Sequence, residues 1–503
     1  MTWRISEDKG KRGLSLRPQM RKRGVFAAAC ATVLGALIAM PVHGADEKSV
    51  LPPRPDNAAI NYLLAAAQIV RPQTDADVKA LDFIEEDFQR LPPAALKARP
   101  DAVEIFLREG GVIRDIHRGA GKPKCQFDVD WEEGPEAFMP HLPLMRNLAR
   151  QATAVARHQE FTGHPEEAAT VYADVAQMSA HIAQEPTVLS KLVAAAVNNM
   201  NIHAVEGFLA RDPPPEAVEQ LMAGLARVPD HPFHIDRGLL GDGERFGDWF
   251  LRHPRGFVTL GIKNPADADD LIMKYYENIE FFDALDRELS SKPGPTQSEL
   301  YYKSPEALAV LQAAVEEYRE NLRKLAALAR EPYFKSGEAF AALQAAIDKR
   351  LEEMKVETAA AMQASIEKRL GEMMADLAKG NPLLLLLAEG RRAYLVCNMS
   401  EAQLGMLRIM VAAAMHKAEK GAYPDTLEEL AGYFPAGASK DPFTGKDFLY
   451  RLKDGLPAIE CNPPESVRSA DWYKAESASL DLGRRRQKDA EALKNFLEKR
   501  AAQ

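Results

Sequence analysis

The residue types best suited to chemistry gather in one short stretch, His231-Pro-Phe-His234-Ile-Asp236. It opens a polar, glycine-rich connection that also holds Asp242, Glu244 and His253. Imidazole nitrogens and carboxylate oxygens are zinc ligands, and three of them around an open coordination position can activate a water molecule. His231, His234 and Asp236 are therefore the candidate metal ligands, and a metal-dependent hydrolase of the cell envelope is one hypothesis for the function.

A competing interpretation treats residues 230–254 as a polar loop between domains. In that case the carboxylates cap helices, and the imidazoles lie on the surface beside Pro232 and Phe233. A His-x-x-His pair on a loop that contains proline does not aim both rings at one point. The sequence favours this interpretation, so no metal or other cofactor is expected.

A second acidic stretch contains Asp128, Asp130, Glu132 and Glu133. It has the oxygen ligands that calcium prefers, but it lacks the turn glycine and the final bidentate glutamate of an EF-hand. A solvated acidic loop is therefore the favoured interpretation.

Familiar catalytic motifs are absent from the sequence. It contains no His-Glu-x-x-His, Gly-x-Ser-x-Gly, phosphate-binding Gly-x-x-x-x-Gly-Lys, or Cys-x-x-Cys motif, and no dinucleotide fingerprint after a strand. Their absence disfavours the common hydrolases and nucleotide-dependent enzymes. An uncharacterised binding or scaffolding role is favoured over catalysis, and the sequence assigns no catalytic residue.

The first 45 residues have the order of an export signal. Basic residues precede an uncharged run over 25–42, which ends in Pro41 and small residues. This order predicts a signal peptide that is cleaved after Gly44 or Ala45. The alternative is an uncleaved anchor formed by residues 25–42, since a membrane span needs about 20 apolar residues. In both cases we expect the body of the protein in the periplasm or the cell envelope.

The net charge of the chain limits the kinds of partner that it can bind. Residues 1–45 hold eight of the 64 basic and two of the 73 acidic residues, so the remainder carries 56 basic and 71 acidic residues and a net charge of −15. Such a surface repels nucleic acid. The compact basic run Arg484-Arg485-Arg486 is expected to be a solvated face of a short tail helix.

Three cysteines follow the signal: Cys125, Cys397 and Cys461. An exported chain can oxidise one pair of these thiols, so one disulfide is an alternative to three free cysteines.

Apolar residues recur at helical spacing along almost the whole chain, between Pro, Gly and capping residues. The predicted fold class is mostly α, an irregular array of antiparallel helical hairpins joined by short turns such as Gly163-His164-Pro165. Helices are expected to begin near Asp56, Thr74 and Asp101, and further helices over 142–162, 165–184, 187–211, 215–227, 265–289 and 305–330.

An apolar stripe from Leu343 to Leu377 predicts one long amphipathic helix of about 60 Å at 1.5 Å per residue. We expect it to protrude, to pair with another helix or to form a coiled coil with a second copy, so helical surfaces are the expected site of a protein partner. A buried helix over 383–388 follows, and the capping box Ser400-Glu-Ala-Gln403 predicts the start of a helix that ends at Lys420.

The segment 404–462 contains an amphipathic helix, then Gly421-Ala-Tyr423-Pro424, Asp441-Pro-Phe-Thr-Gly445 and Tyr450-Arg451. On these residues it resembles the periplasmic part of the major pseudopilins of type II secretion, and similar tails close many uncharacterised exported helical proteins of bacteria. The resemblance implies a small α+β module and, as a further hypothesis, an accessory of a secretion or pilus-like system. The turn at Asp441 and Gly445 predicts a strand pair over 448–452 and 457–461.

One hairpin, with Ala168 and Tyr172 in its second helix, resembles a tetratricopeptide repeat, in which small and large side chains interlock. Together these features divide the chain into an N-terminal signal or anchor (1–45), a helical-hairpin domain (46–235), a second helical region (236–335), the long amphipathic helix and buried helix (336–400), the pseudopilin-like module (401–465) and a charged tail helix (466–503).

Overall fold

The computed structural model describes residues 56–69, 72–108, 110–253, 305–365, 383, 387, 390–434, 440–469 and 478–501. The predicted export signal with Gly44 and Ala45, and the helix expected over 265–289, lie outside these residues. None of the described helices combines the length and the apolar character that a membrane crossing requires. The fold is mostly helical, with one small antiparallel sheet.

Capping side chains set the first helices. The Asn57 side chain accepts a hydrogen bond from the Ala59 N–H at 3.1 Å, and Thr74 forms a capping box with Asp77. The elements of this part are α2 (Ala58–Ala67), α3 (Asp75–Asp82), the short turns η1 (Phe83–Asp87), η2 (Phe88–Arg90) and η3 (Pro93–Ala98), α4 (Pro100–Arg108), α5 (Gly110–Ala120) and η4 (Trp131–Glu136).

Helix α5 was not predicted, because Gly110-Gly111 has the composition of a helix end. The structure instead places Gly111 within α5, where an added Cβ would lie 2.0 Å from the Gln68 side-chain oxygen. Close packing against the end of α2 therefore accounts for this glycine, in a position that local sequence cannot reveal.

The four hairpin helices agree with the prediction. They are α6 (His141–Thr162), α7 (Pro165–Ile182), α8 (Val188–Ala210) and α9 (Pro215–Leu225). Gly163 ends α6 with a left-handed φ of 85°, and Thr187 caps α8 by accepting a hydrogen bond from the Ser190 N–H at 3.1 Å. Tyr172 is fully buried between these helices, and its hydroxyl donates to Glu160 at 2.6 Å.

The polar loop predicted over 230–254 is wrong for most of its length, since Asp236–Arg252 form helix α10. Its glycines permit close approach to other elements. A Cβ on Gly241 would lie 2.0 Å from the Pro186 carbonyl oxygen, and one on Gly243 would lie 2.9 Å from Leu322 of α14. The glycine content that indicates a loop in isolation serves helix packing in the folded chain.

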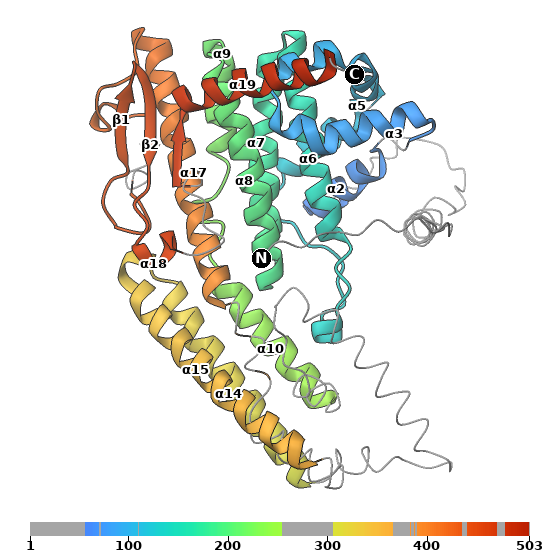
Figure 1. The fold of residues 1–503 in the computed structure, drawn as a ribbon, viewed down its shortest axis with the longest axis vertical. Helices are drawn as coiled ribbons and strands as arrows, with labels where there is room; N and C mark the ends of the chain where they lie inside the picture. The colour runs from blue at the N-terminus through green and yellow to red at the C-terminus, as the bar shows by residue number, and fades with distance from the viewer. Residues whose placement is uncertain are drawn as a thin grey trace, which may run out of the picture. The chain divides into compact units, whose positions relative to one another are not determined.

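Two long helices follow, α14 (Pro305–Ala329) and α15 (Tyr333–Ser365). The predicted long helix is thus confirmed as far as Ser365, and the rest of its stripe, to Leu377, lies outside the described residues. In Figure 1 α14 and α15 run side by side, joined by a tight turn, and α10 packs against α14. Over its described residues the long helix therefore pairs with a helix of its own chain.

Helix α17 (Gly390–Lys420) begins before the predicted capping box and runs through it. Ser400 lies inside the helix, where its hydroxyl donates to the Val396 carbonyl oxygen at 3.1 Å, and the Gln403 side chain donates to Asn199 of α8 at 2.9 Å. Ser and Thr make this bond to the preceding turn within helices, so the capping pattern was misleading at Ser400.

The sheet has three antiparallel strands in the order β1 (Leu449–Lys453), β2 (Leu456–Glu460) and β3 (Ser479–Asp481). Asp454 and Gly455 join the first two with φ values of 53° and 76°, as a tight hairpin requires. The predicted strand pair is confirmed. The third strand was missed, because it comes from the region predicted to be only a charged tail helix.

The remaining described elements are η7 (Glu428–Leu430), α18 (Glu465–Arg468) and α19 (Leu482–Ala501). Figure 1 shows α17 between α8 and the sheet, and α19 across α8. One hydrophobic core joins Tyr62 of α2 to Leu482 of α19, and a smaller one surrounds Phe88. The chain from Asp56 to Gln503 is accordingly one compact unit.

The arginine run of α19 is solvated only in part, since Arg486 is exposed whereas Arg484 and Arg485 are half-buried. The Arg485 side chain is 14% exposed and pairs with Asp489 at 2.8 Å. Arg484 donates to the Ser479 carbonyl oxygen at 3.2 Å, and Arg486 donates to the Ala210 carbonyl oxygen. The bond from Arg486 holds α19 on the end of α8.

Cys125, Cys397 and Cys461 are buried, free thiols, so no disulfide joins them. Burial raises the pKa of each, for Cys397 to about 12. Protonated buried thiols behave as small apolar side chains, which is how these three contribute to the core.

Candidate metal centre

Three potential ligands converge beside α17. A nitrogen of His231, a nitrogen of His234 and a carboxylate oxygen of Glu401 all lie within 4.8 Å of one another. His231 Nδ1 is 3.6 Å from Glu401 Oε2, and the two imidazole rings lie 5.3 Å apart between centroids. Within the described ranges, no other group of three His, Cys, Asp or Glu side chains comes together in this way.

The turn that carries the histidines connects α9 to α10 and is fastened to α17 by Arg408. The guanidinium of Arg408 donates to the Val228 carbonyl oxygen at 2.6 Å and to Asp230 Oδ1 at 2.9 Å. The Phe233 ring is fully buried, and the Phe233 N–H donates to Glu401 Oε1 at 2.5 Å. These bonds fix the turn and Glu401 relative to each other.

His231 has a left-handed backbone with a φ of 57°. A residue other than glycine adopts this conformation at an energetic cost, and such residues are concentrated at functional sites. Here the conformation lets His231 and His234 both face Glu401, which a Pro-containing loop was not expected to allow.

The two imidazoles have different electrostatic environments. The nearby carboxylate of Glu401 raises the pKa of His231, whereas burial lowers the pKa of His234. At neutral pH the His234 ring is therefore neutral, which is the form that binds a metal ion.

The three side chains line a cavity of about 420 Å³. Its other walls come from the turn between α14 and α15 and from the segment before β1, which meet where the Phe334 N–H donates to the Pro442 carbonyl oxygen at 3.1 Å. Cys397 and Glu401 lie on the same face of α17 and both border the cavity. The volume is in the range of small-molecule sites.

The other sequence candidates lie elsewhere. Asp236 pairs with Arg330 at 3.1 Å, Asp242 accepts a hydrogen bond from the Val188 N–H at 3.0 Å, and the His253 ring stacks on Trp249. In the acidic stretch predicted to be a solvated loop, Asp130 caps η4 by accepting from the Glu132 N–H at 3.0 Å.

Glu401 was missed by sequence reasoning, although it completes the group. Glu401 and Phe233, which lies between the two histidines, are 168 positions apart in the chain. The one available signal is the helical spacing of Cys397, Glu401 and Arg408, which puts a thiol, a carboxylate and a guanidinium along one side of a helix.

No protein-family model, no curated protein and no solved structure matches this chain.

Several residues that carry the sequence resemblance in segment 404–462 form hydrogen bonds within that segment. Asp441 accepts hydrogen bonds from the N–H groups of Phe443 and Asn462 at 2.9 and 2.8 Å, and the Tyr450 hydroxyl donates to the Pro424 carbonyl oxygen at 2.8 Å.

Proposed function

We propose that this protein binds a divalent transition-metal ion, with zinc the best match, through His231, His234 and Glu401. The convergence of these three side chains at the wall of a cavity carries the proposal. The export signal expected over residues 1–45 supports a site of action in the periplasm or envelope.

The ligand set suits zinc in type, and the one ligand pair with a defined distance suits it in spacing. Zinc–ligand bonds of about 2.0–2.2 Å in a tetrahedral site put the ligand atoms roughly 3.4 Å apart. The 3.6 Å between His231 Nδ1 and Glu401 Oε2 is close to this value. The Phe233 N–H holds the second oxygen of Glu401, an outer contact of the kind that orients a metal-binding carboxylate.

Two histidines and a glutamate leave a fourth coordination position, and the cavity of about 420 Å³ supports access to it. The same ligand set serves zinc in metallopeptidases, where the ion activates water. Metal-dependent hydrolysis in the envelope is therefore a second candidate function. The helical surfaces and the pseudopilin-like segment support a scaffolding role or a secretion accessory less directly, because neither identifies a ligand.

Zinc binding is tested with the protein from residue 46 onward. After chelator treatment and dialysis, we expect calorimetric titration with zinc to show one ion per chain. His234→Ala and Glu401→Gln should each weaken zinc binding at least tenfold, because each variant removes one of the three ligands. His231→Asn is the third variant, because asparagine tolerates the left-handed backbone at this position.

His253→Ala is the matched control, because His253 stacks on Trp249 outside the group and should leave zinc binding unchanged. Protons compete for imidazole, so affinity should fall as pH drops, and His231, whose pKa is raised, should take up a proton before His234. Absence of stoichiometric zinc, or equal loss in the control, would refute the site. Chelator-sensitive cleavage of fluorescent casein or nitrophenyl esters, lost in Glu401→Gln, would establish the hydrolase.

A further inference from the structure

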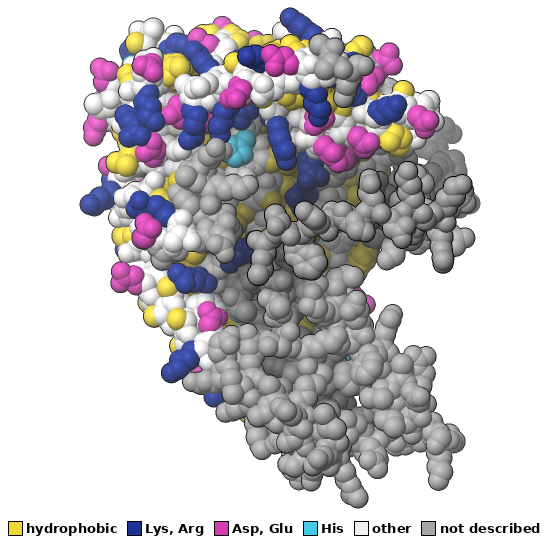
Figure 2. All heavy atoms as spheres, in the orientation of Figure 1, with side chains coloured by type: hydrophobic (Ala, Val, Ile, Leu, Met, Phe, Trp, Pro, Cys, Tyr) yellow, Lys and Arg dark blue, Asp and Glu magenta, His cyan; other side chains and the backbone are white. Residues whose placement is uncertain are grey.

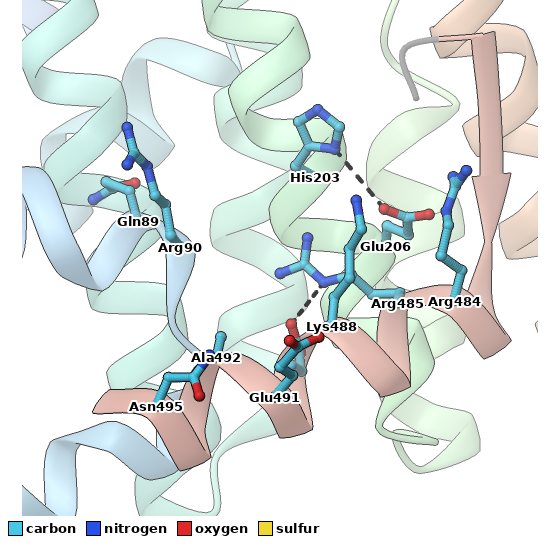
Figure 3. Close-up of a pocket in the computed structure, with 11 residues that line it drawn as sticks. Gln89, Arg90, His203, Glu206, Arg484, Arg485, Lys488, Glu491, Ala492 and Asn495 are labelled. Atoms are coloured by element: carbon cyan, nitrogen blue, oxygen red, sulfur yellow. Dashed lines mark hydrogen bonds and ion pairs between the residues drawn. The ribbon is translucent and has the colours of Figure 1, made fainter. Parts of the chain in front are cut away.

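A second cavity, of about 460 Å³, lies between α8, η2 and α19. Figure 3 shows the cationic side chains around it: Arg90 on one wall, and Arg484, Arg485 and Lys488 from α19 on the other, with His203 of α8 between them. Figure 2 shows Lys and Arg side chains on this part of the surface, interspersed with Asp and Glu. The cavity itself is lined by three arginines and one lysine against three carboxylates, in a chain whose net charge is negative.

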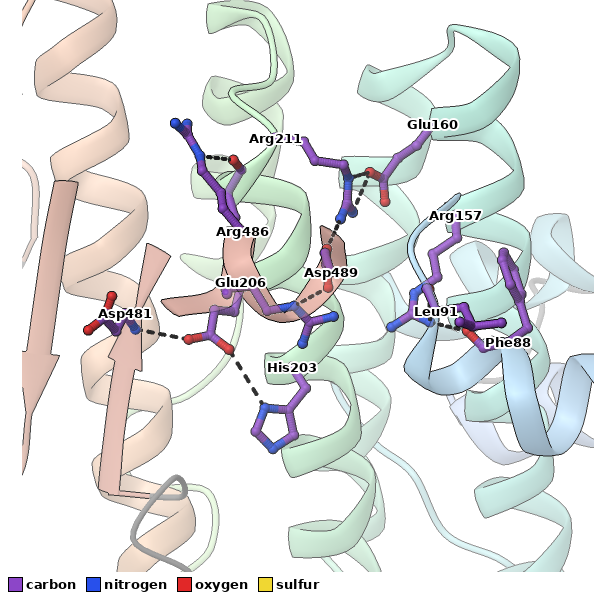
Figure 4. Close-up of polar contacts among 12 residues, drawn as sticks. Phe88, Leu91, Arg157, Glu160, His203, Glu206, Arg211, Asp481, Arg486 and Asp489 are labelled. Carbon is purple, nitrogen blue, oxygen red and sulfur yellow. Dashed lines mark hydrogen bonds and ion pairs between the residues drawn. The ribbon is translucent and has the colours of Figure 1, made fainter. Parts of the chain in front are cut away.

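Two of the three acidic side chains that line this cavity are engaged by the fold, and the third, Glu491, is exposed on α19. Glu206 accepts a hydrogen bond from the Asp481 N–H at 2.9 Å, and Asp489 accepts from Arg211 and Arg485 at 2.9 and 2.8 Å (Figure 4). These bonds fix the C-terminal helix, and Arg484, Lys488 and Glu491 of that helix line the cavity.

Several guanidinium groups lie close together behind the α19 wall of this cavity. Burial lowers the pKa of Arg157, and the nearby charges of Arg485 and Arg211 lower it further. Gly207 makes room for this crowding, because a Cβ there would lie 3.1 Å from nitrogens of both Arg211 and Arg485. Asp489 and Glu160 offset the charges of Arg485 and Arg211. Arg90, Arg484 and Lys488 add positive charge around the cavity, which favours an anion there.

We propose that this cavity binds a small molecule carrying a phosphate group. Arginine offers paired N–H donors that match the oxygens of phosphate, and lysine adds a compact charge. A phosphate between Arg90 and the cations of α19 would join the N-terminal part of the unit to its C-terminal helix. The volume fits a phosphate ester rather than a polymer, and the acidic net charge disfavours nucleic acid.

Binding is tested on the protein from residue 46 onward, in the presence of a chelator so that a metal at His231 makes no contribution. The probes are inorganic phosphate, glycerol phosphate, and vesicles of neutral lipid with or without phosphatidylglycerol. We expect saturable binding of at least one phosphate probe by calorimetry, together with slower proteolysis of α19. Binding of glycerol phosphate identifies a soluble ester, and binding only of the anionic vesicles identifies a lipid headgroup.

The double variant Arg484→Gln/Lys488→Gln should weaken binding at least tenfold, and Arg90→Gln tests the opposite wall with an exposed residue. The control is Lys494→Gln/Arg500→Gln, which removes the same charge from exposed positions of the same helix outside the cavity. Circular dichroism checks that each variant is folded. Equal weakening in the control, or no saturable binding of any probe, would overturn the proposal.

Discussion

The ionisation of individual side chains in this protein depends on the neighbours that the fold places beside them. Asp242 lies in a stretch rich in polar residues, yet it is buried at the start of α8, where one oxygen accepts from the Val188 N–H and the other has no hydrogen-bond partner. Burial raises the pKa of Asp242 to about 7. His181, held by Tyr62 and Gln177, shows the opposite effect, since burial lowers its pKa to about 4.

The buried carboxyl of Asp242 makes stability depend on pH. Its folded pKa is above the unfolded one, so its contribution is fully present below about pH 4 and is lost as pH rises through 7. Asp242→Asn keeps the acceptor for Val188 and cannot ionise. Between pH 5 and pH 8 we expect the free energy of unfolding of the variant, measured in urea, to rise relative to that of the wild type by about 2–3 kcal/mol.

Asp248→Asn serves as the control, because Asp248 is an exposed residue of the same helix and pairs with Arg319 at the surface. Its effect on the free energy of unfolding should be equal at the two pH values. A pH-independent effect of Asp242→Asn as well would contradict the buried ionisation.

Helix α10 shows how packing decides an element's structure. A stretch with glycines at 238, 241, 243 and 247 has low helix propensity, which is why its sequence indicates a loop. Contact with the start of α8 and with α14 nevertheless makes it a helix, since the glycines let the neighbouring backbone and side chains approach. Its N-terminal end leads directly from the turn that carries His231 and His234.

Two alanine substitutions in α10 separate propensity from packing. Ala normally stabilises a helix over Gly by about 1 kcal/mol. At Gly241 the added Cβ would meet the Pro186 backbone oxygen at 2.0 Å, so Gly241→Ala should instead destabilise the protein by about 2 kcal/mol in chemical unfolding.

Gly243→Ala meets the Leu322 side chain, most closely at its far end at 2.9 Å, and no backbone atom as near, so it should cost less than Gly241→Ala. If the two variants lower the free energy of unfolding equally, the contact with Pro186 does not limit how closely α10 approaches the start of α8.

At the scale of the molecule, the two ends of the described chain share one core. β3 extends the sheet that packs on α17, and Leu482 at the start of α19 is fully buried in the cluster that also contains Tyr62. The C-terminal segment thus belongs to the body of the protein, although its composition is that of a charged tail.

Leu482→Ala should therefore destabilise the whole unit, by about 2–5 kcal/mol, in one cooperative thermal transition. Leu497→Ala, on the same helix at a position 44% exposed, should change the melting temperature little. Followed by circular dichroism, a separate early transition in the Leu482 variant, with an unchanged main transition, would show instead that the tail folds independently.

The sequence alone determined the positions of most helices, because their signals are local. The helix start at Thr74 and the Gly163 cap act within one helical turn, and the turn at Asp441 and Gly445 indicated the strand pair that follows it. Only the tertiary structure decided that α10 is a helix, that β3 joins the sheet, and that Glu401 meets His231 and His234. Each of these depends on contacts between segments that are far apart in the chain, and the energies of such contacts cannot be predicted from a local sequence pattern.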